Sequence, residues 1–186
     1  MTLQPSEVLA FWFEDDPSIR LEKWFKKDPA FDTACATFTS AIREARAGHL
    51  DHWAATPKGG LALIILLDQL SRNVFRNTAE AFAADPHART IARRMIANGF
   101  DTMLHPHERM FVYLPFEHSE VLEDQHESVR LFETLRADLG DDTIRYAHDH
   151  RDVIAQYGRF PHRNAALGRV CTPAEETYLA RPNAGF

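Results

Sequence analysis

The chain has few of the residues that build a disulfide framework or a thiolate metal site. Its two cysteines, Cys35 and Cys171, lie far apart in the sequence and form no CxxC motif. Frameworks and metal sites of this kind need several cysteines at characteristic spacings. We therefore expect two reduced thiols, with Cys35 buried on the apolar face of a helix.

Long apolar runs and an excess of basic residues are also missing. The longest purely apolar run, 61–67, is far shorter than the roughly 20 residues that span a bilayer. Residues 1–14 contain no basic region followed by a small-residue cleavage site. The formal net charge of −6 at pH 7 gives no general electrostatic basis for binding nucleic acid. We expect a cytoplasmic protein with no membrane or nucleic-acid partner, and the oligomeric state stays open.

What the chain does contain is the composition of a globular protein. Hydrophobic residues make up 45% and charged residues 26% of its 186 residues, which is far from the low-hydrophobicity composition of disordered chains. A chain of this length buries a core of its own. We predict a single helical domain over residues 1–186.

Helix starts are marked by a capping residue directly before a proline, a pair that suits the first helical position. The pair occurs at 28–29, 56–57, 85–86 and 172–173. After Thr172, Glu175 follows at the spacing of a capping box. These are the four most clearly marked helix starts.

Apolar residues recur at spacings of three and four, no run alternates between apolar and polar residues, and no Asn-Gly or Asp-Gly turn separates apolar runs. The sequence therefore predicts an all-α fold. The prolines at 29, 57, 86 and 115 are compatible with a degenerate helix-pair repeat or with coincidence. We expect helices at 8–13, 29–48, from 57 through the buried run 61–67, and at 86–98, 106–114, 119–139, 142–157 and from 173.

The central helix ends in polar side chains that share one face. At about 100° per residue, they span an arc of roughly 140°. This face is either the solvated end of the helix, with an ion pair between Asp68 and Arg72, or the wall of a polar pocket. Its residues are Asp68, Gln69, Arg72, Asn73 and Arg76.

A second polar group, 117–120, directly follows Leu114-Pro115-Phe116. We predict Ser119 as the N-cap of the next helix, with Glu117 near that helix N-terminus. A nucleophile and base pair formed by His118 and Ser119 is disfavoured, because adjacent residues rarely point at each other.

Further along, His148 aligns with Ile144, Arg151 and Ile154 on a helix face that is otherwise apolar. Buried polar groups need partners. His148 is therefore either a hydrogen-bonded core histidine or a direct participant in a site.

The most polar segment is 158–169, which follows a predicted helix end at Gly158. Because arginine suits carboxylates and phosphates, this segment is the best candidate for binding an anionic group. The alternative is a structural loop whose arginines bond carbonyls and buried acids such as Asp68 or Glu117. Its polar side chains are Arg159, His162, Arg163, Asn164 and Arg169.

Common catalytic and cofactor signatures are missing: the chain has no HExxH, no P-loop, no GxGxxG and no GxSxG. The pairs at 105/107 and 148/150 are two residues apart, and their side chains diverge by about 200° on a helix. We expect no metal and no cofactor.

Four strings in this chain belong together: 11–13; 62–69 with 72–73 and 76; 114–120; and 158–164 with 167–169. They resemble the bacterial family known as domain of unknown function 924, and the resemblance covers essentially the whole chain. It implies a tetratricopeptide-like, alpha-alpha superhelix of paired antiparallel helices and no established activity. Cys171, where serine is expected, and Tyr157, where phenylalanine is expected, are mild departures.

Three functions follow as hypotheses. In the first, the chain binds a small anionic molecule or a peptide carboxylate in a polar pocket. In the second, it is an enzyme, such as a hydrolase, that uses a histidine general base in that pocket. In the third, its polar groups form a buried structural network without a ligand. All three require the polar segments to converge. The candidate residues are Asp68, Gln69, Arg72, Asn73, Arg76, Glu117, His118, His148, Arg159, His162, Arg163 and Asn164.

Overall fold

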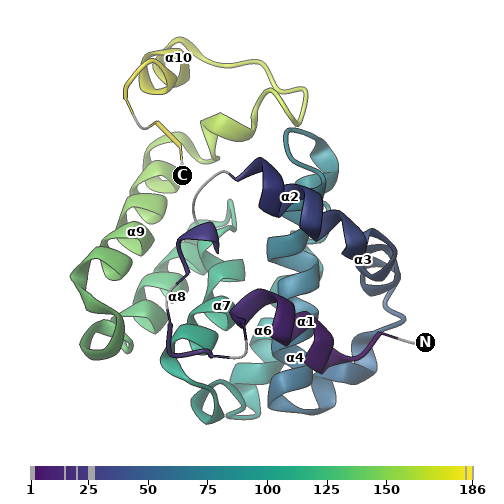
Figure 1. The fold of residues 1–186 in the computed structure, drawn as a ribbon. Helices are drawn as coiled ribbons and strands as arrows, with labels where there is room; N and C mark the ends of the chain where they lie inside the picture. Colours follow the sequence, from purple (N-terminus) through teal and green to yellow (C-terminus); the bar gives the residue numbers. More distant parts are fainter. Residues whose placement is uncertain (1–2, 15, 20, 25–27, 183, 186) are drawn as a thin grey trace. The chain divides into compact units, whose positions relative to one another are not determined.

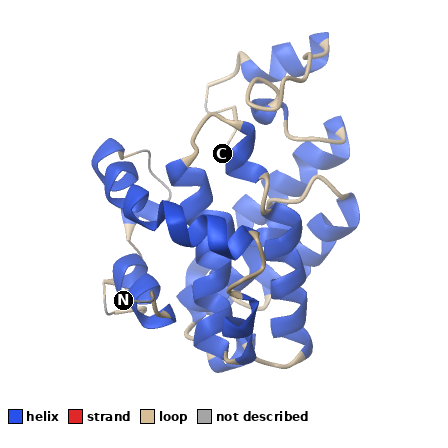
Figure 2. Ribbon diagram, turned by 90° about the vertical axis from the view of Figure 1, so that its right-hand side faces the viewer, coloured by secondary structure: helices blue, strands red, loops and turns tan. Residues whose placement is uncertain are grey.

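The computed structural model describes residues 3–14, 16–19, 21–24, 28–182 and 184–185. Within these residues every regular element is helical and none is a strand (Figure 2), so the predicted all-α fold is confirmed. No helix of this described part is long and apolar enough to cross a bilayer. The α-helices are α1 (Pro5–Phe13), α2 (Pro29–Cys35), α3 (Thr39–Arg46), α4 (Pro57–Ile64), α5 (Ser71–Val74), α6 (Asp85–Ala97), α7 (Pro106–Glu117), α8 (Leu122–Glu133), α9 (Arg136–Tyr157) and α10 (Pro173–Leu179).

Short helical segments of other types lie between several of these elements. One of them, η4 (Ile65–Leu70), is a π-helical segment that joins α4 directly to α5. The others are 3-10 turns: η1 (Glu22–Trp24), η2 (Ala36–Phe38), η3 (Asp51–Ala55), η5 (Ala79–Phe82), η6 (Asp101–Met103) and η7 (Pro161–Arg163).

The chain divides into two compact units. Unit 1 comprises Met1–Arg76 and Glu80–Pro115, and unit 2 comprises Asn77–Ala79 and Phe116–Phe186. The single domain over residues 1–186 and the tetratricopeptide-like pairing of helices stay predictions.

Unit 1 is built around the continuous helix formed by α4, η4 and α5, against which α1 and α6 pack (Figure 1). All residues of 61–67 are fully buried, as predicted for the central helix. An aromatic cluster lies beside it, in which Phe111 makes edge contacts with Trp12 and Trp24 at ring separations of 5.6 and 5.0 Å. Cys35 is also fully buried in this unit, and burial raises the pKa of its thiol to about 12.

Three of the four predicted caps are confirmed. Asp28 accepts hydrogen bonds at the start of α2, Thr56 accepts one at the start of α4, and Thr172 with Glu175 forms a complete capping box at α10. At α6 the cap position is Ala84, and Asp85 is the first helical residue. The Asp85 carboxylate is used elsewhere, in the ion pair with Arg72.

The observed end of α7 and start of α8 differ from the predicted ones. Helix α7 does not end at Leu114 but includes Pro115 and reaches Glu117. Ser119 is not an N-cap, because α8 starts at Leu122 after Val121. Ser119 instead donates its hydroxyl hydrogen to Asp124, at 2.7 Å. Glu117 thus lies at the end of α7 and not near a helix N-terminus.

Two further predicted helices are interrupted. The segment 29–48 is divided into α2 and α3 by the turn η2. The predicted helix 119–139 ends as α8 at Glu133, and α9 already begins at Arg136. Gly140 interrupts α9 with a φ of 77° and a ψ of 167°, a conformation that favours glycine. The helical run therefore resumes after Gly140, close to the predicted start at 142.

Unit 2 consists of the packed pair α8 and α9 (Figure 1), followed by η7 and α10. Helix α9 ends at Gly158, whose φ of 68° places it in the left-handed region, as predicted for a helix stop. A small core of Val153, Ile154 and Phe160 lies next to this stop. The segment 158–169 is therefore anchored through Phe160, which is fully buried.

Gly59 and Gly60 at the start of α4 offer a matched test of packing in unit 1. A Cβ at Gly59 would lie 2.1 Å from the main-chain oxygen of Trp53, whereas one at Gly60 would meet the flexible side chain of Met95 at 2.6 Å. We expect Gly59→Ala to lower the free energy of unfolding by about 3 kcal/mol and Gly60→Ala by about 1 kcal/mol or less. Urea denaturation of both variants measures this difference. Equal losses would contradict the backbone contact.

Candidate functional site

Four rings form a row in unit 2, which we name the ring row: His118, His150, Phe160 and His162. Successive ring centroids are 6.3, 5.6 and 5.5 Å apart. His150 and Phe160 are buried, whereas His118 and His162 at the two ends are half-buried. The row therefore joins a buried centre to two partly accessible histidines.

The turn that carries His118 is fixed by a buried glutamine. Gln125 of α8 donates its amide hydrogens to the main-chain oxygens of Glu117 and Ser119, both at 2.6 Å. The last carbonyl groups of a helix have no partner within the helix. Gln125 supplies one at the end of α7 and so positions both Glu117 and His118.

The buried His150 is held in one tautomer. Its Nδ1 lies 2.8 Å from the main-chain oxygen of Tyr146 and 3.4 Å from Oε1 of Glu117. A carbonyl oxygen only accepts hydrogen bonds, so Nδ1 carries the hydrogen, and the neutral ring has its lone pair on Nε2. This is the arrangement of a histidine that acts as a base or hydrogen-bond acceptor through Nε2.

His150 is neutral in the folded protein. Burial lowers its pKa well below the ordinary value, and the neighbouring His118, Arg163 and His162 lower the pKa further, against the hydrogen bond to Tyr146. Buried groups generally avoid the charged form in this way.

Arg163 is the arginine of 158–169 that joins the ring row. Its guanidinium carbon lies 4.4 Å from the centroid of the Phe160 ring, and the residue is 6% exposed. A guanidinium over an aromatic face is attracted by the ring quadrupole. Arg163 is thus placed over the centre of the row.

The other two arginines of this segment form ion pairs with carboxylates. Arg159 bonds both oxygens of Glu175, at 2.6 and 2.8 Å, and these bonds, together with the main-chain N–H of Thr172, lower the pKa of Glu175 to about 2. Arg169 bonds both oxygens of Glu120, at 2.7 and 2.9 Å. For these two arginines the geometry supports the alternative interpretation of the segment, in which its arginines have a structural role.

Asn164 belongs to the same structural group. Its Oδ1 accepts a hydrogen bond from Arg169 at 2.9 Å, and its Nδ2 donates to the sulfur of Cys171 at 3.3 Å. Asn164 is 1% exposed. It therefore links Arg169 and Cys171 within this part of the chain.

His148 lies outside the ring row. The buried positions of α9 after its kink include Ala147, His150 and Ile154, so the buried stripe passes through His150 rather than His148. His148 is partly exposed, and its Nε2 lies 3.0 Å from Oε1 of Glu133. Sequence reasoning chose the wrong histidine for the buried face, because it assigned the apolar stripe of this helix from Ile144 and Arg151.

The polar end of the central helix is buried at its start and partly exposed from Arg72 onward, and it contains the predicted ion pair of Asp68 and Arg72. Asp68 is fully buried and Gln69 is 6% exposed. Arg72 bonds Asp85 through two parallel contacts of 3.0 Å and lies 3.0 Å from Asp68. Burial opposes the charge on Arg72, but Asp68 and Asp85 outweigh it and raise the pKa of Arg72.

The last two residues of this group share one carboxylate. Arg76 donates to both oxygens of Asp32, at 2.8 and 2.7 Å, and Asn73 donates to the same side chain at 2.8 Å. All these partners belong to unit 1. The predicted convergence of this group with 117–118 and 158–169 stays a prediction, whereas the last two segments do meet at the ring row.

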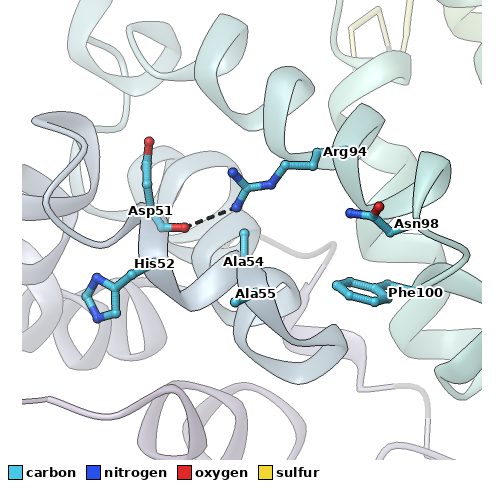
Figure 3. Close-up of a pocket in the computed structure, with 7 residues that line it drawn as sticks. All are labelled: Asp51, His52, Ala54, Ala55, Arg94, Asn98 and Phe100. Carbon is cyan, nitrogen blue, oxygen red and sulfur yellow. Dashed lines mark hydrogen bonds between the residues drawn. The ribbon is translucent and has the colours of Figure 1, made fainter.

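Two hollows in unit 1 contain residues that sequence reasoning did not select. One has a volume of about 520 Å³ and includes Phe13 together with the ion pair of Lys58 and the buried Glu108. The other has a volume of about 490 Å³ and is lined by η3 and the end of α6 (Figure 3). Within the described residues, no three His, Cys, Asp or Glu side chains gather as a metal site.

Comparison with known proteins places the chain in a family. Residues 8–183 match the family described as bacterial protein of unknown function, DUF924, and the chain belongs to this family. It is similar to the solved structure of the protein of unknown function ATU0120 from Agrobacterium tumefaciens, at 39% identity and a TM-score of 0.84, over 95% of this chain and 96% of that chain. No curated protein matches the sequence.

Proposed function

We propose that unit 2 binds a small anionic molecule, carrying a carboxylate or a phosphate group, at the ring row. The observation that carries the proposal is the set of basic side chains along the ring row: His118 lies next to the buried His150, and His162 and Arg163 lie against Phe160. Three basic side chains along this row favour an anion through hydrogen bonding and charge, against the opposing charge of the Glu117 carboxylate beside His150. The partly accessible ends of the row are where a ligand would enter.

The position of Arg163 supports this choice of site. Arg159 and Arg169 form their ion pairs with Glu175 and Glu120, which lie outside the segment 158–169. Arg163 lies at the ring row itself, with its guanidinium carbon 4.4 Å from the centroid of the Phe160 ring. A ligand carboxylate or phosphate would thus be recognised by Arg163 together with His118 and His162.

Calorimetric titration tests the proposal with inorganic phosphate, succinate and a short peptide with a free C-terminal carboxylate. The same peptide with an amidated C-terminus is the matched probe, because it lacks the carboxylate charge. We expect at least one of the anions to bind the wild-type protein, and His118→Ala and Arg163→Gln to weaken that binding by about tenfold or more, as loss of a charged hydrogen bond predicts.

The matched control is His126→Ala, which removes an exposed histidine of the same unit that is outside the ring row. This variant should bind as tightly as the wild type. Circular dichroism confirms that each variant is folded before its affinity is compared. Absence of binding by every anion to the folded wild type, or equal affinity in all variants, would rule out the proposal.

A hydrolase is the second candidate, and the contact between Glu117 and His150 favours it. The carboxylate lies 3.4 Å from Nδ1, so it orients the ring and would stabilise the imidazolium that forms when Nε2 takes a proton from water. Turnover of a p-nitrophenyl ester or phosphate, lost in His150→Gln while anion binding persists, would support this function. Equal turnover in that variant would exclude His150 as the base.

A further inference from the structure

The hollow of about 490 Å³ in unit 1 is formed by two segments that face each other. The turn η3 supplies one side, and the last turn of α6 with the residues after it supplies the other (Figure 3). The volume is within the range of small-molecule sites. The lining residues are Asp51, His52, Ala54, Ala55, Arg94, Asn98 and Phe100.

The hollow combines an apolar surface with one fixed cationic group. Ala54, Ala55 and the ring of Phe100 line its apolar part. Arg94 reaches across from α6 and donates to the main-chain oxygen of Asp51 at 3.1 Å (Figure 3). A guanidinium carries five N–H donors, so this single bond orients Arg94 and leaves donors for a ligand.

One carboxylate belongs to the lining, that of Asp51. Its side chain points away from Ala54 and Ala55 (Figure 3), and its Oδ1 lies 2.9 Å from Nε2 of His87, a residue outside the hollow. Nδ1 of His52 lies 3.2 Å from the main-chain oxygen of His49, which places the hydrogen on Nδ1. The Asn98 amide adds a neutral donor and acceptor beside the Phe100 ring (Figure 3).

The geometry points to a binding site for a planar aromatic carboxylate in this hollow. The flat ring would lie against Phe100 and the two alanines, because aromatic rings gain from offset or edge contacts with one another. The carboxylate would receive two parallel hydrogen bonds from Arg94, whose fork matches that geometry. Asn98 would bond a polar substituent on the ring.

Amide NMR spectra of the full chain test this site with benzoate. Two probes separate its two recognition elements: cyclohexanecarboxylate keeps the charge without the flat ring, and benzyl alcohol keeps the ring without the charge. We expect benzoate to shift the signals of 51–55 and 94–100, and each comparison probe to bind at least about threefold more weakly.

Variants at exposed or half-buried positions complete the test. Arg94→Gln and Phe100→Leu should weaken benzoate binding by about tenfold and threefold, respectively. Arg93→Gln, which removes the neighbouring exposed arginine outside the hollow, should leave it unchanged. Thermal unfolding verifies that the variants are folded.

The site is overturned if benzoate at about 10 mM leaves the signals of 51–55 and 94–100 in place. It is also overturned if Arg94→Gln and Arg93→Gln bind benzoate equally. Shifts confined to His118, His162 and their neighbours would overturn this site and support anion binding at the ring row. The experiment can therefore contradict one of the two proposed sites without contradicting the other.

Discussion

Replacing Arg72 with methionine should lower the free energy of unfolding of the protein by about 3–5 kcal/mol. Arg72 lies between Asp68, which is fully buried, and Asp85, which is 5% exposed. Methionine fills a similar volume but leaves two buried carboxylates without the guanidinium that compensates them. The loss of one member of a buried ion cluster is far more destabilising than the loss of an exposed pair.

Arg76→Met is the matched control for this prediction. Its partner Asp32 has a side chain that is 19% exposed, and the Arg76 side chain is 34% exposed. Water compensates the carboxylate left behind, and we expect a loss of about 1 kcal/mol. Guanidinium denaturation of both variants measures the two losses, and equal values would show that Asp68 and Asp85 do not depend on Arg72 for compensation.

His150 should make the free energy of unfolding fall as the pH drops below about 6.5, the ordinary pKa of histidine. The pKa of His150 is lowered in the folded state, so in this range the unfolded chain binds a proton that the folded chain does not. Unfolding is then favoured by up to about 1.4 kcal/mol per pH unit for this one group. The effect ends at the pH where the folded ring itself becomes protonated.

The measurement is the free energy of unfolding at several pH values between about 8 and 5, for the wild type and for His150→Gln. The glutamine cannot take up the proton, so its stability should fall less with pH. The pKa values of the Glu133 and Glu175 carboxylates are lowered to about 2. The stabilisation that these carboxylates contribute is lost only below the ordinary pKa of glutamate, so they do not affect the pH dependence in this range. Parallel curves for both proteins would contradict the neutral state of His150.

Much of the fold follows from local sequence signals. The pairs of a capping residue and a proline at Asp28 and Thr56 act within one helical turn, and the fully apolar run 61–67 has no polar side to expose. Such signals do not depend on the rest of the chain. Helix ends near Pro115 and Ser119 were predicted wrongly, because Pro115 is accommodated within the last turn of α7 and Ser119 has a partner in Asp124.

The candidate site was predicted only in part, because the partner of a charged residue is set by contacts between distant segments. Nothing near Arg76 in the sequence indicates Asp32, and nothing near Arg169 indicates Glu120. For the polar end of the central helix, the ion pair between Asp68 and Arg72 could be predicted from their spacing, whereas the pairs of Arg72 with Asp85 and of Arg76 with Asp32 could not. His118 and Arg163, which were selected from the sequence, lie next to His150 and Phe160, respectively, but the buried His150 itself was not selected.

Anion binding at the ring row is tested most directly by the side-chain nitrogen NMR signals of the histidines during titration with inorganic phosphate. Of the ten histidines, His118 and His162 should shift together and saturate, while the exposed His126 and the Glu133-bound His148 stay in place. Saturable shifts at these two residues are the predicted result. Signals of His118 and His162 that do not move, or equal drift of all ten, would contradict binding at the ring row.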